Sequence, residues 1–212
     1  MNMDKFNLSL YLVTDRHCLR GRDFYEAVEE ALRAGVTLLQ LREKDMGLED
    51  LLAEGRKVQA LCRKYQVPFL VDDNVEAARI LGADGVHLGQ EDEAIEKARS
   101  VLGPDAIIGI SAHNLEEAQK AQASGADYLG VGALYPTGSK KDASLLPPGM
   151  LTEIVQAVQI PVVGIGGIQE AQIDQVLDQG AAGCAMISAI LGADDITATV
   201  ERMKARIRAR EK

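Results

Sequence analysis

Short apolar runs alternate with amphipathic stretches along the whole chain. In the apolar runs, hydrophobic residues follow one another instead of alternating with polar ones, which predicts β-strands buried on both faces. Between them, hydrophobic residues recur every three or four positions, which predicts helices with one buried face. The predicted strands cover residues 9–14, 37–42, 68–71, 85–88, 107–111, 128–131, 162–165 and 183–187. The predicted helices run from residue 24 to a stop at Gly35 and over 49–65, 74–81, 92–102, 115–124, 146–157, 170–179 and 194–210.

Glycine turns mark the return from a helix to the next strand. Gly35, Gly82, Gly125 and Gly180 each stand between a predicted helix and the following strand, where glycine commonly ends a helix. Together with about eight strand–helix units, this weak internal repeat predicts an α/β fold, a (β/α)8 TIM barrel, with a single catalytic domain over residues 1–212. An open doubly wound sheet is the competing interpretation, but no G-x-G-x-x-G follows the first strand.

Net charge, apolar content and cysteine spacing limit the partners and the compartment expected for this chain. The formal net charge is −9, so nucleic acid and anionic membranes are not expected as partners, and any anion must be held by a local pocket. No apolar run approaches the roughly 20 residues that a membrane helix needs, and the first residues lack the apolar core of a signal peptide. Cys18, Cys62 and Cys184 lack metal-site spacing. They suggest reduced thiols in a cytoplasmic protein.

Polar residues gather at the carboxyl ends of the predicted strands, where the chemistry of a TIM barrel is located. In an extended strand Gln40, Arg42 and Lys44 share one face, so two cations and an amide converge at this rim. The other strand ends contribute Asp72, Asp73, His87, Asp92, Ser111, His113, the loop 137–142, Gly166, Gly167, Ile187 and Ser188. The opposite rim carries glycine, alanine and aspartate turn residues and little else. This asymmetry predicts an enzyme.

Two groups at this rim suggest a phosphorylated ligand. Gly166 and Gly167 precede a predicted helix, and with the strand end at Ile187 and Ser188 they suit a phosphate, although two glycines could also form a plain tight turn. Asp73 and Asp92 follow neighbouring strands and suit Mg²⁺, although an aspartate here could instead cap a helix. The nearby cations favour the metal, because they and a divalent ion could hold a pyrophosphate together.

Other segments and residues of the chain have structural roles as their expected or alternative interpretation. The loop 133–148 lacks periodicity and suggests a mobile lid, or else a solvated loop. His87 is expected as a packed rim residue and His113 as a helix-start residue. Cys184 and Met186 are expected to pack within the last strand, in the core or at the rim, and residues 201–212 to form a solvated helical face that frays.

Several motifs carry a resemblance to a known family. They are Tyr-Leu-Val-Thr-Asp at 11–15, Gln-Leu-Arg-Glu-Lys at 40–44, Gly-Ala-Asp-Gly-Val-His-Leu-Gly-Gln-Glu-Asp at 82–92, Gly-Val-Gly at 130–132, Pro-Thr-Gly-Ser-Lys-Lys-Asp at 136–142 and Ile-Gly-Gly-Ile at 165–168. In this order, and over nearly the whole chain, they resemble thiamine-phosphate synthase. The resemblance implies a TIM-barrel transferase of thiamine biosynthesis. Such an enzyme joins a pyrimidine carried as its pyrophosphate ester to a thiazole phosphate, using Mg²⁺, and releases pyrophosphate and thiamine phosphate.

The resemblance also assigns roles by position. It implies a pyrimidine-pyrophosphate site of Gln40, Arg42, Lys44, Asp72, Ser111 and Lys140. It implies Mg²⁺ ligands at Asp73 and Asp92, and a thiazole-phosphate site of Thr137, Ser139, Gly167, Ile187 and Ser188. Two positions depart from the family pattern: Asp72 stands where many members have Asn, and Ser139 replaces the commoner Thr while keeping the hydroxyl.

The implied chemistry needs no general base. Pyrophosphate departs from a benzylic-type carbon in a dissociative substitution, and Arg42, Lys44, Lys140 and Mg²⁺ would stabilise the charge of the leaving group. Two alternatives stay open: a thiazole tautomerase using His113, and a non-catalytic sensor of phosphorylated ligands. The expected partners are two small phosphorylated substrates. The sequence leaves room for a homo-oligomer and does not say whether the thiazole is carboxylated.

Overall fold

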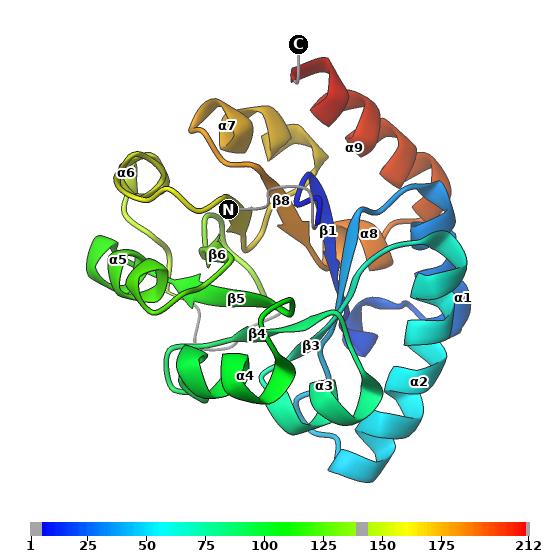
Figure 1. The fold of residues 1–212 in the computed structure, drawn as a ribbon. Coiled ribbons are helices and arrows are strands. Elements are labelled where there is room, and N and C mark those ends of the chain that lie inside the picture. The colour runs from blue at the N-terminus through cyan, green and yellow to red at the C-terminus, as the bar shows by residue number, and fades with distance from the viewer. Residues whose placement is uncertain (1–5, 139–143, 211–212) are drawn as a thin grey trace.

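Eight parallel strands close into a barrel, each hydrogen-bonded to the next and β8 to β1, in the computed structural model, which describes residues 6–138 and 144–210. The α/β prediction of a (β/α)8 TIM barrel is confirmed, and the open sheet is excluded by the β1–β8 pairing. The helices surround the strands (Figure 1). The strands are β1 (Leu10–Val13), β2 (Leu38–Leu41), β3 (Phe69–Asp72), β4 (Gly85–Leu88), β5 (Ile107–Ala112), β6 (Tyr128–Val131), β7 (Val162–Ile165) and β8 (Gly183–Met186).

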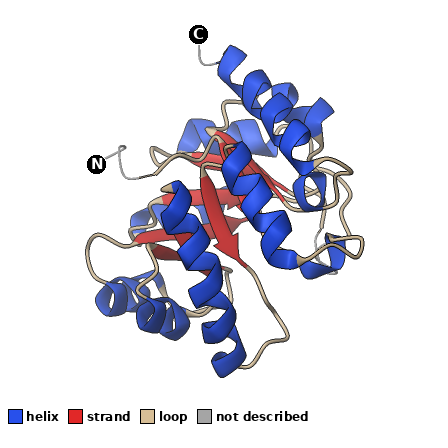
Figure 2. Ribbon diagram, turned by 90° about the vertical axis from the view of Figure 1, so that its right-hand side faces the viewer, coloured by secondary structure: helices blue, strands red, loops and turns tan. Residues whose placement is uncertain are grey.

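Helices connect consecutive strands and lie outside the barrel wall, as the side view shows (Figure 2). Their bounds are η1 (Arg16–Cys18), α1 (Phe24–Ala34), α2 (Leu48–Tyr65), α3 (Val75–Leu81), α4 (Ile95–Leu102), α5 (Leu115–Ala123), α6 (Met150–Ala157), η2 (Glu170–Gln172), α7 (Ile173–Asp178), α8 (Ser188–Leu191) and α9 (Ile196–Arg210). Within the described residues, no helix has both the length and the apolarity to cross a membrane.

The strand residues divide between two buried layers. One face of each strand packs against the helices, and Leu39, Leu41, Cys184 and Met186 belong to this outer layer. The other face fills the barrel with the side chains of Tyr11, Val13, Leu38, Leu70, Ile107, Tyr128, Val163 and Ala185. Cys184 and Met186, expected in the core or at the rim, lie in the core. This alternation also places residue 40 inside the barrel and directs residue 42 toward its mouth.

Some predicted boundaries were wrong, for local reasons. The helix predicted from residue 92 begins at Ile95, and the helix predicted from 146 begins at Met150, after Pro147 and Pro148, which lack the backbone N–H groups of a continuing helix. The short segments α8 and η1 were not predicted, because they are too short to show a helical period.

Residues 201–210 form a mostly exposed helical face, as predicted, but the expectation that it frays was wrong for its described part. Helix α9 continues to Arg210 and lies beside α7. Arg202 and Arg206 on α9 pair with Glu170 and Asp174, at 3.0 Å and 2.7 Å. One turn further on, Arg210 pairs with Asp178.

Candidate active site

Backbone hydrogen bonds fix the strand end that carries Arg42. The N–H group of Thr14 donates to the carbonyl of Gln40 at 3.0 Å, and the N–H group of Arg42 donates to the hydroxyl of Thr14 at 3.0 Å. Thr14 is fully buried, so this bond between the ends of β1 and β2 is shielded from water. The direction in which Arg42 leaves the barrel is therefore set by the wall itself.

Cations and carboxylates from three strand ends meet beside Arg42. The guanidinium lies 3.7 Å from a carboxylate oxygen of Asp72 (from Nε) and 3.9 Å from one of Asp15 (from Nη1). The ammonium of Lys44 lies 3.2 Å from Asp72 and also contacts the carboxylate of Asp73. Because both Arg42 separations exceed a hydrogen-bond length, its N–H groups remain able to bind an anion. The predicted convergence of Arg42 and Lys44 is present.

The side chain of Asp72, only 9% exposed, lies among these charges. Burial raises the pKa of its carboxyl, the cations Lys44 and Arg42 act to lower that pKa, and the negative charge of Asp92 raises it again. The net shift is upward. The carboxylate of Asp92, which follows β4, is therefore close enough to act on that of Asp72, at the end of β3.

Neither predicted metal ligand caps a helix. The cap of α3 is Asn74, whose side-chain oxygen accepts the N–H of Ala77 at 2.8 Å. Asp73 precedes it with a positive φ of 58°, held by its N–H bond to the carbonyl of His87 at 2.8 Å. Asp92 lies before α4 and accepts the N–H of Gly89 at 2.5 Å. The helix-cap interpretation of these two aspartates is therefore wrong.

The donor set fits a magnesium ion only in part. Hard carboxylate oxygens suit Mg²⁺, which typically keeps several waters and takes phosphate oxygens from a substrate. Within the described part of the chain, no three or more His, Cys, Asp or Glu side chains are grouped as a metal site. Asp73 and Asp92 could thus hold the ion only together with water or substrate oxygens.

The predicted pyrimidine contacts Gln40 and Ser111 lie deeper than the cations. Gln40 is 3% exposed and donates through Nε2 to the hydroxyl of Tyr11 at 2.5 Å. The hydroxyl of Ser111, on β5, lies 3.0 Å from Nε2 of His87. His87 is a buried interior residue rather than a rim residue. Their partner Tyr11 was not predicted as a site residue, and His87 was named among the strand-end residues but was expected only to pack.

A small pocket forms where β7 and β8 end. Its volume is about 20 Å³, and it is lined by Thr137, Ile165, Gly166, Gly167, Ile168, Ala185, Met186, Ile187 and Ser188. A Cβ on Gly167 would lie 2.5 Å from the carbonyl oxygen of Pro136, so only glycine lets this loop approach. Four residues of the predicted thiazole-phosphate site, Thr137, Gly167, Ile187 and Ser188, are thus brought together. Ser139 and Lys140 lie outside the described residues.

His113 is held at the start of α5. Its ring Nδ1 and its backbone N–H both lie 2.8 Å from a carboxylate oxygen of Glu117. Although burial raises the pKa of Glu117, these hydrogen bonds lower it below its usual value. This position agrees with the expected helix-start role.

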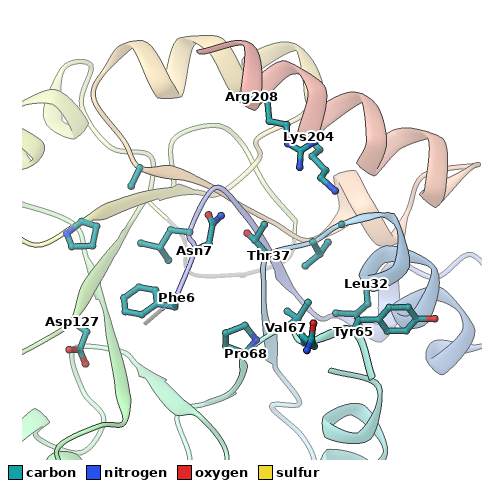
Figure 3. A pocket seen from close by; sticks show the side chains of 16 residues that line it. Phe6, Asn7, Leu32, Thr37, Tyr65, Val67, Pro68, Asp127, Lys204 and Arg208 are labelled. Atoms are coloured by element: carbon teal, nitrogen blue, oxygen red, sulfur yellow. The ribbon is translucent and has the colours of Figure 1, made fainter. Parts of the chain in front are cut away.

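A larger cavity lies at the opposite end of the barrel. Its volume is about 940 Å³, and its lining residues mostly precede the strands, such as Phe6, Thr37 and Pro68. Lys204 and Arg208 reach toward it from α9 (Figure 3). Little besides turn residues was predicted at this rim, and the position of these two cations was not predicted.

Comparison with known proteins identifies the family. The family model described as thiamine monophosphate synthase matches residues 10–190. The chain belongs to the thiamine monophosphate synthase family. It is 46% identical over 194 residues to the thiamine-phosphate synthase of Clostridium acetobutylicum, covering 92% of each chain. It is 48% identical over 192 residues to that of Clostridium novyi, covering 90% of this chain and 94% of the relative.

A solved structure agrees with this assignment. The thiamine phosphate pyrophosphorylase from Pyrococcus furiosus matches with a TM-score of 0.88 and 40% identity, over 97% of this chain and 98% of that one. Membership of the thiamine monophosphate synthase family makes the chain an enzyme, a transferase of thiamine biosynthesis, and the resemblance noted from its motifs is confirmed.

Proposed function

We propose that this chain joins 4-amino-2-methyl-5-(diphosphooxymethyl)pyrimidine to a thiazole phosphate, giving thiamine phosphate and pyrophosphate. The observation that carries the proposal is the convergence of Arg42 and Lys44 with Asp72 and Asp73 at one barrel mouth. The small pocket beside Gly167 offers a separate place for the second substrate's phosphate. The relatives' names support the same reaction.

The balance of charge at the mouth supports a need for a divalent ion. Among the residues that the structure describes, the carboxylates of Asp15, Asp72, Asp73 and Asp92 outnumber the cations Arg42 and Lys44. Such a mouth attracts a pyrophosphate poorly unless positive charge is added. Bound at Asp73 and Asp92, Mg²⁺ would supply that charge and act as a Lewis acid on the phosphate oxygens.

The residues of the chain then have distinct tasks. As the carbon–oxygen bond to the pyrimidine methylene breaks, pyrophosphate leaves with the bonding electrons. Arg42 and Lys44, joined by Lys140, stabilise the growing negative charge, and Lys44 exchanges its carboxylate partners for phosphate oxygens. The thiazole nitrogen gives its lone pair to the new carbon–nitrogen bond. Because that nitrogen carries no proton to remove, no general base is assigned.

Thr137, Ser139, Gly167, Ile187 and Ser188 would orient the second substrate by its phosphate. Backbone N–H groups and hydroxyls suit phosphate oxygens, and the described members of this set line one pocket. Fixing the phosphate there would bring the thiazole ring toward the mouth, so that the two reacting atoms meet in a near-attack arrangement.

The test is to mix the purified protein with both substrates, with and without Mg²⁺, and to measure thiamine phosphate and pyrophosphate. Equal amounts of both products, formed only with a divalent ion, are expected. A parallel sample with the thiazole carboxylate phosphate alone tests the tautomerase alternative, in which His113 would move a proton. Isomerisation without coupling would favour that alternative, and ligand binding without either reaction would favour a sensor.

A further inference from the structure

A continuous line of hydrogen bonds crosses the interior of the barrel. Gln40 Nε2 donates to the hydroxyl of Tyr11 at 2.5 Å, and that hydroxyl lies 2.8 Å from the hydroxyl of Tyr128. The Tyr128 hydroxyl lies 2.8 Å from Nδ1 of His87, whose Nε2 lies 3.0 Å from the hydroxyl of Ser111. These five residues, here called the polar relay, come from β2, β1, β6, β4 and β5. They connect the two predicted pyrimidine contacts.

The polar relay is costly for a barrel core, which would be filled more simply by aliphatic side chains. Tyr11 and Tyr128 are 1% and 0% exposed, and a buried hydroxyl is destabilising unless it is hydrogen-bonded. Burial also raises the pKa of both phenols, so each keeps its proton and can donate. Within the described residues, no buried side-chain nitrogen or oxygen lacks a partner.

Neighbouring strands make room for these rings. A Cβ on Gly109 would lie 2.1 Å from the Tyr128 ring, so β5 must carry glycine there while Tyr128 keeps its place. A Cβ on Gly130 would lie 3.1 Å from the His87 ring. Glycine weakens a strand interior and often marks a close approach. Two strands therefore accept a less favourable residue where the polar relay passes, which points to a role beyond packing.

The distances are compatible with hydrogen bonds that all run in one direction. With Gln40 donating to Tyr11, Tyr11 would donate to Tyr128, and Tyr128 would donate to Nδ1 of His87. Nε2 of His87 would then carry the ring proton and donate to Ser111. The hydroxyl proton of Ser111 and the amide oxygen of Gln40 are the two ends of the line. One end offers a donor and the other an acceptor.

We propose that Tyr11, Tyr128 and His87 are positioning residues that hold Ser111 as a donor and Gln40 as an acceptor toward the aminopyrimidine ring. An aminopyrimidine presents an amino donor beside ring-nitrogen acceptors, which is the complementary pattern. A ring lacking the amino group would lose its hydrogen bond to Gln40, and a site built to make such a bond rejects the analogue strongly. The inference rests on the proposed function, because it assumes a pyrimidine substrate.

The test measures direct binding of 4-amino-5-hydroxymethyl-2-methylpyrimidine, which has no phosphate, and separately of inorganic pyrophosphate with Mg²⁺. In Tyr128→Phe and Tyr11→Phe, the dissociation constant for the pyrimidine alcohol is expected to rise roughly tenfold, as for the loss of one hydrogen bond. The constant for pyrophosphate should stay within about twofold, because the cations at the mouth are untouched. In turnover, KM for the pyrimidine substrate should rise while KM for the thiazole phosphate does not.

Tyr65→Phe is the matched control. Its hydroxyl donates to Glu29 at 3.0 Å, away from the polar relay, so this variant loses a phenol hydrogen bond without altering pyrimidine binding. Thermal unfolding of each variant shows whether the fold is kept. Equal pyrimidine affinity in wild type, Tyr128→Phe and Tyr65→Phe would overturn the inference. Failure of wild type to bind the pyrimidine at all would instead show that the proposed substrate is wrong, and the inference would fall with it.

Nitrogen-15 NMR of the histidine rings gives a second measurement, the tautomer of His87. A purely structural role of Tyr128 would not change this tautomer. The direction of the polar relay requires the neutral His87 ring to carry its proton on Nε2 in wild type. Tyr128→Phe removes the donor to Nδ1, so the ring should become a mixture of both tautomers. A ring protonated on Nδ1 in wild type would reverse the direction and contradict the proposal.

Discussion

The two rims of this barrel use the same residue type for opposite purposes. At the amino-terminal rim, Asp84 accepts the backbone N–H of Phe69 at 2.7 Å, and Asp127 accepts that of Ile108 at 2.8 Å. At the carboxyl-terminal rim, Asp72 and Asp73 face cations. The first pair is committed to holding the wall together, whereas the second pair remains available to a ligand. What an aspartate contacts, and not its presence in a turn, decides its role.

The rim with the larger cavity is not the rim with the clustered charges. The cavity of about 940 Å³ lies at the amino-terminal rim, while the pocket beside Gly167 measures about 20 Å³. The large cavity is lined mainly by residues of the short helix-to-strand turns, with Lys204 and Arg208 at one side. The carboxyl-terminal rim carries the clustered charge that a pyrophosphate requires. The following predictions test whether this division between the rims is correct.

The largest effect is expected from Arg42→Ala. Removing this donor from the leaving-group site should lower kcat for coupling by about 10²–10³, as for other preorganised charge-stabilising donors. Arg208→Ala is the matched arginine at the opposite rim and should change kcat by less than about twofold. Steady-state product formation measures both. Similar losses in the two variants would remove the functional distinction between the rims.

Asp73→Asn should have the next largest effect. Loss of one carboxylate should weaken Mg²⁺ binding at the mouth, so half-maximal activity should need roughly tenfold more Mg²⁺. A magnesium titration of activity measures this shift. Asp84→Ala is the contrasting variant: it should keep the magnesium requirement and instead lower the free energy of unfolding by about 1–3 kcal/mol, because a buried N–H loses its acceptor. An unchanged magnesium requirement in Asp73→Asn would contradict the metal assignment.

Ser188→Ala tests the smaller pocket. Its hydroxyl is expected to bind the phosphate of the thiazole substrate, so KM for that substrate should rise by about five- to tenfold, as for the loss of one hydrogen bond to a charged group. KM for the pyrimidine substrate should not change. Initial rates with each substrate varied in turn separate the two effects. A rise in KM for the pyrimidine substrate alone would contradict the assignment of this pocket to the thiazole phosphate.

Asp72→Asn should give the smallest change, which is a change in how the free energy of unfolding depends on pH. Burial, as the largest cause, raises the pKa of Asp72, so the folded state binds its proton more tightly than the unfolded state. Stability associated with this group is therefore present below the unfolded pKa of about 4 and is lost as pH rises through the folded pKa. Asn lacks this titration, so the variant's stability relative to wild type should increase with pH above about 4. Denaturant unfolding from pH 4 to 8 measures it, and a relative stability that falls with pH would refute the sign.

The sequence revealed the barrel because its strands are continuous apolar runs ended by glycine turns. It also predicted that Arg42, Lys44, Asp73 and Asp92 follow the carboxyl ends of buried strands, because charged residues after apolar runs stand out from their surroundings. Segment α8 escaped notice because four residues show no period. These successes and failures follow from how much local pattern each element contains.

The interior polar residues were harder to predict. Tyr11 and Tyr128 lie within apolar runs and resemble packing residues, since nothing local reveals that their hydroxyls meet across the barrel. Asp15 was noted only as the last residue of the Tyr-Leu-Val-Thr-Asp motif, yet its carboxylate lies 3.9 Å from the guanidinium of Arg42. The one available signal was Gly109, a strand glycine that pairs in register with Tyr128. Using it would have required the strand register, which the sequence does not provide.

The central claim is that the carboxyl-terminal mouth binds pyrophosphate only together with a divalent ion. Calorimetric titration of inorganic pyrophosphate into the intact protein, with Mg²⁺ and then with the metal chelated, tests it most directly. Binding is predicted with Mg²⁺, should weaken at least tenfold on chelation or in Arg42→Ala, and should be unchanged in Arg208→Ala. Pyrophosphate affinity that is the same with and without the metal, or that falls only in Arg208→Ala, would contradict the account.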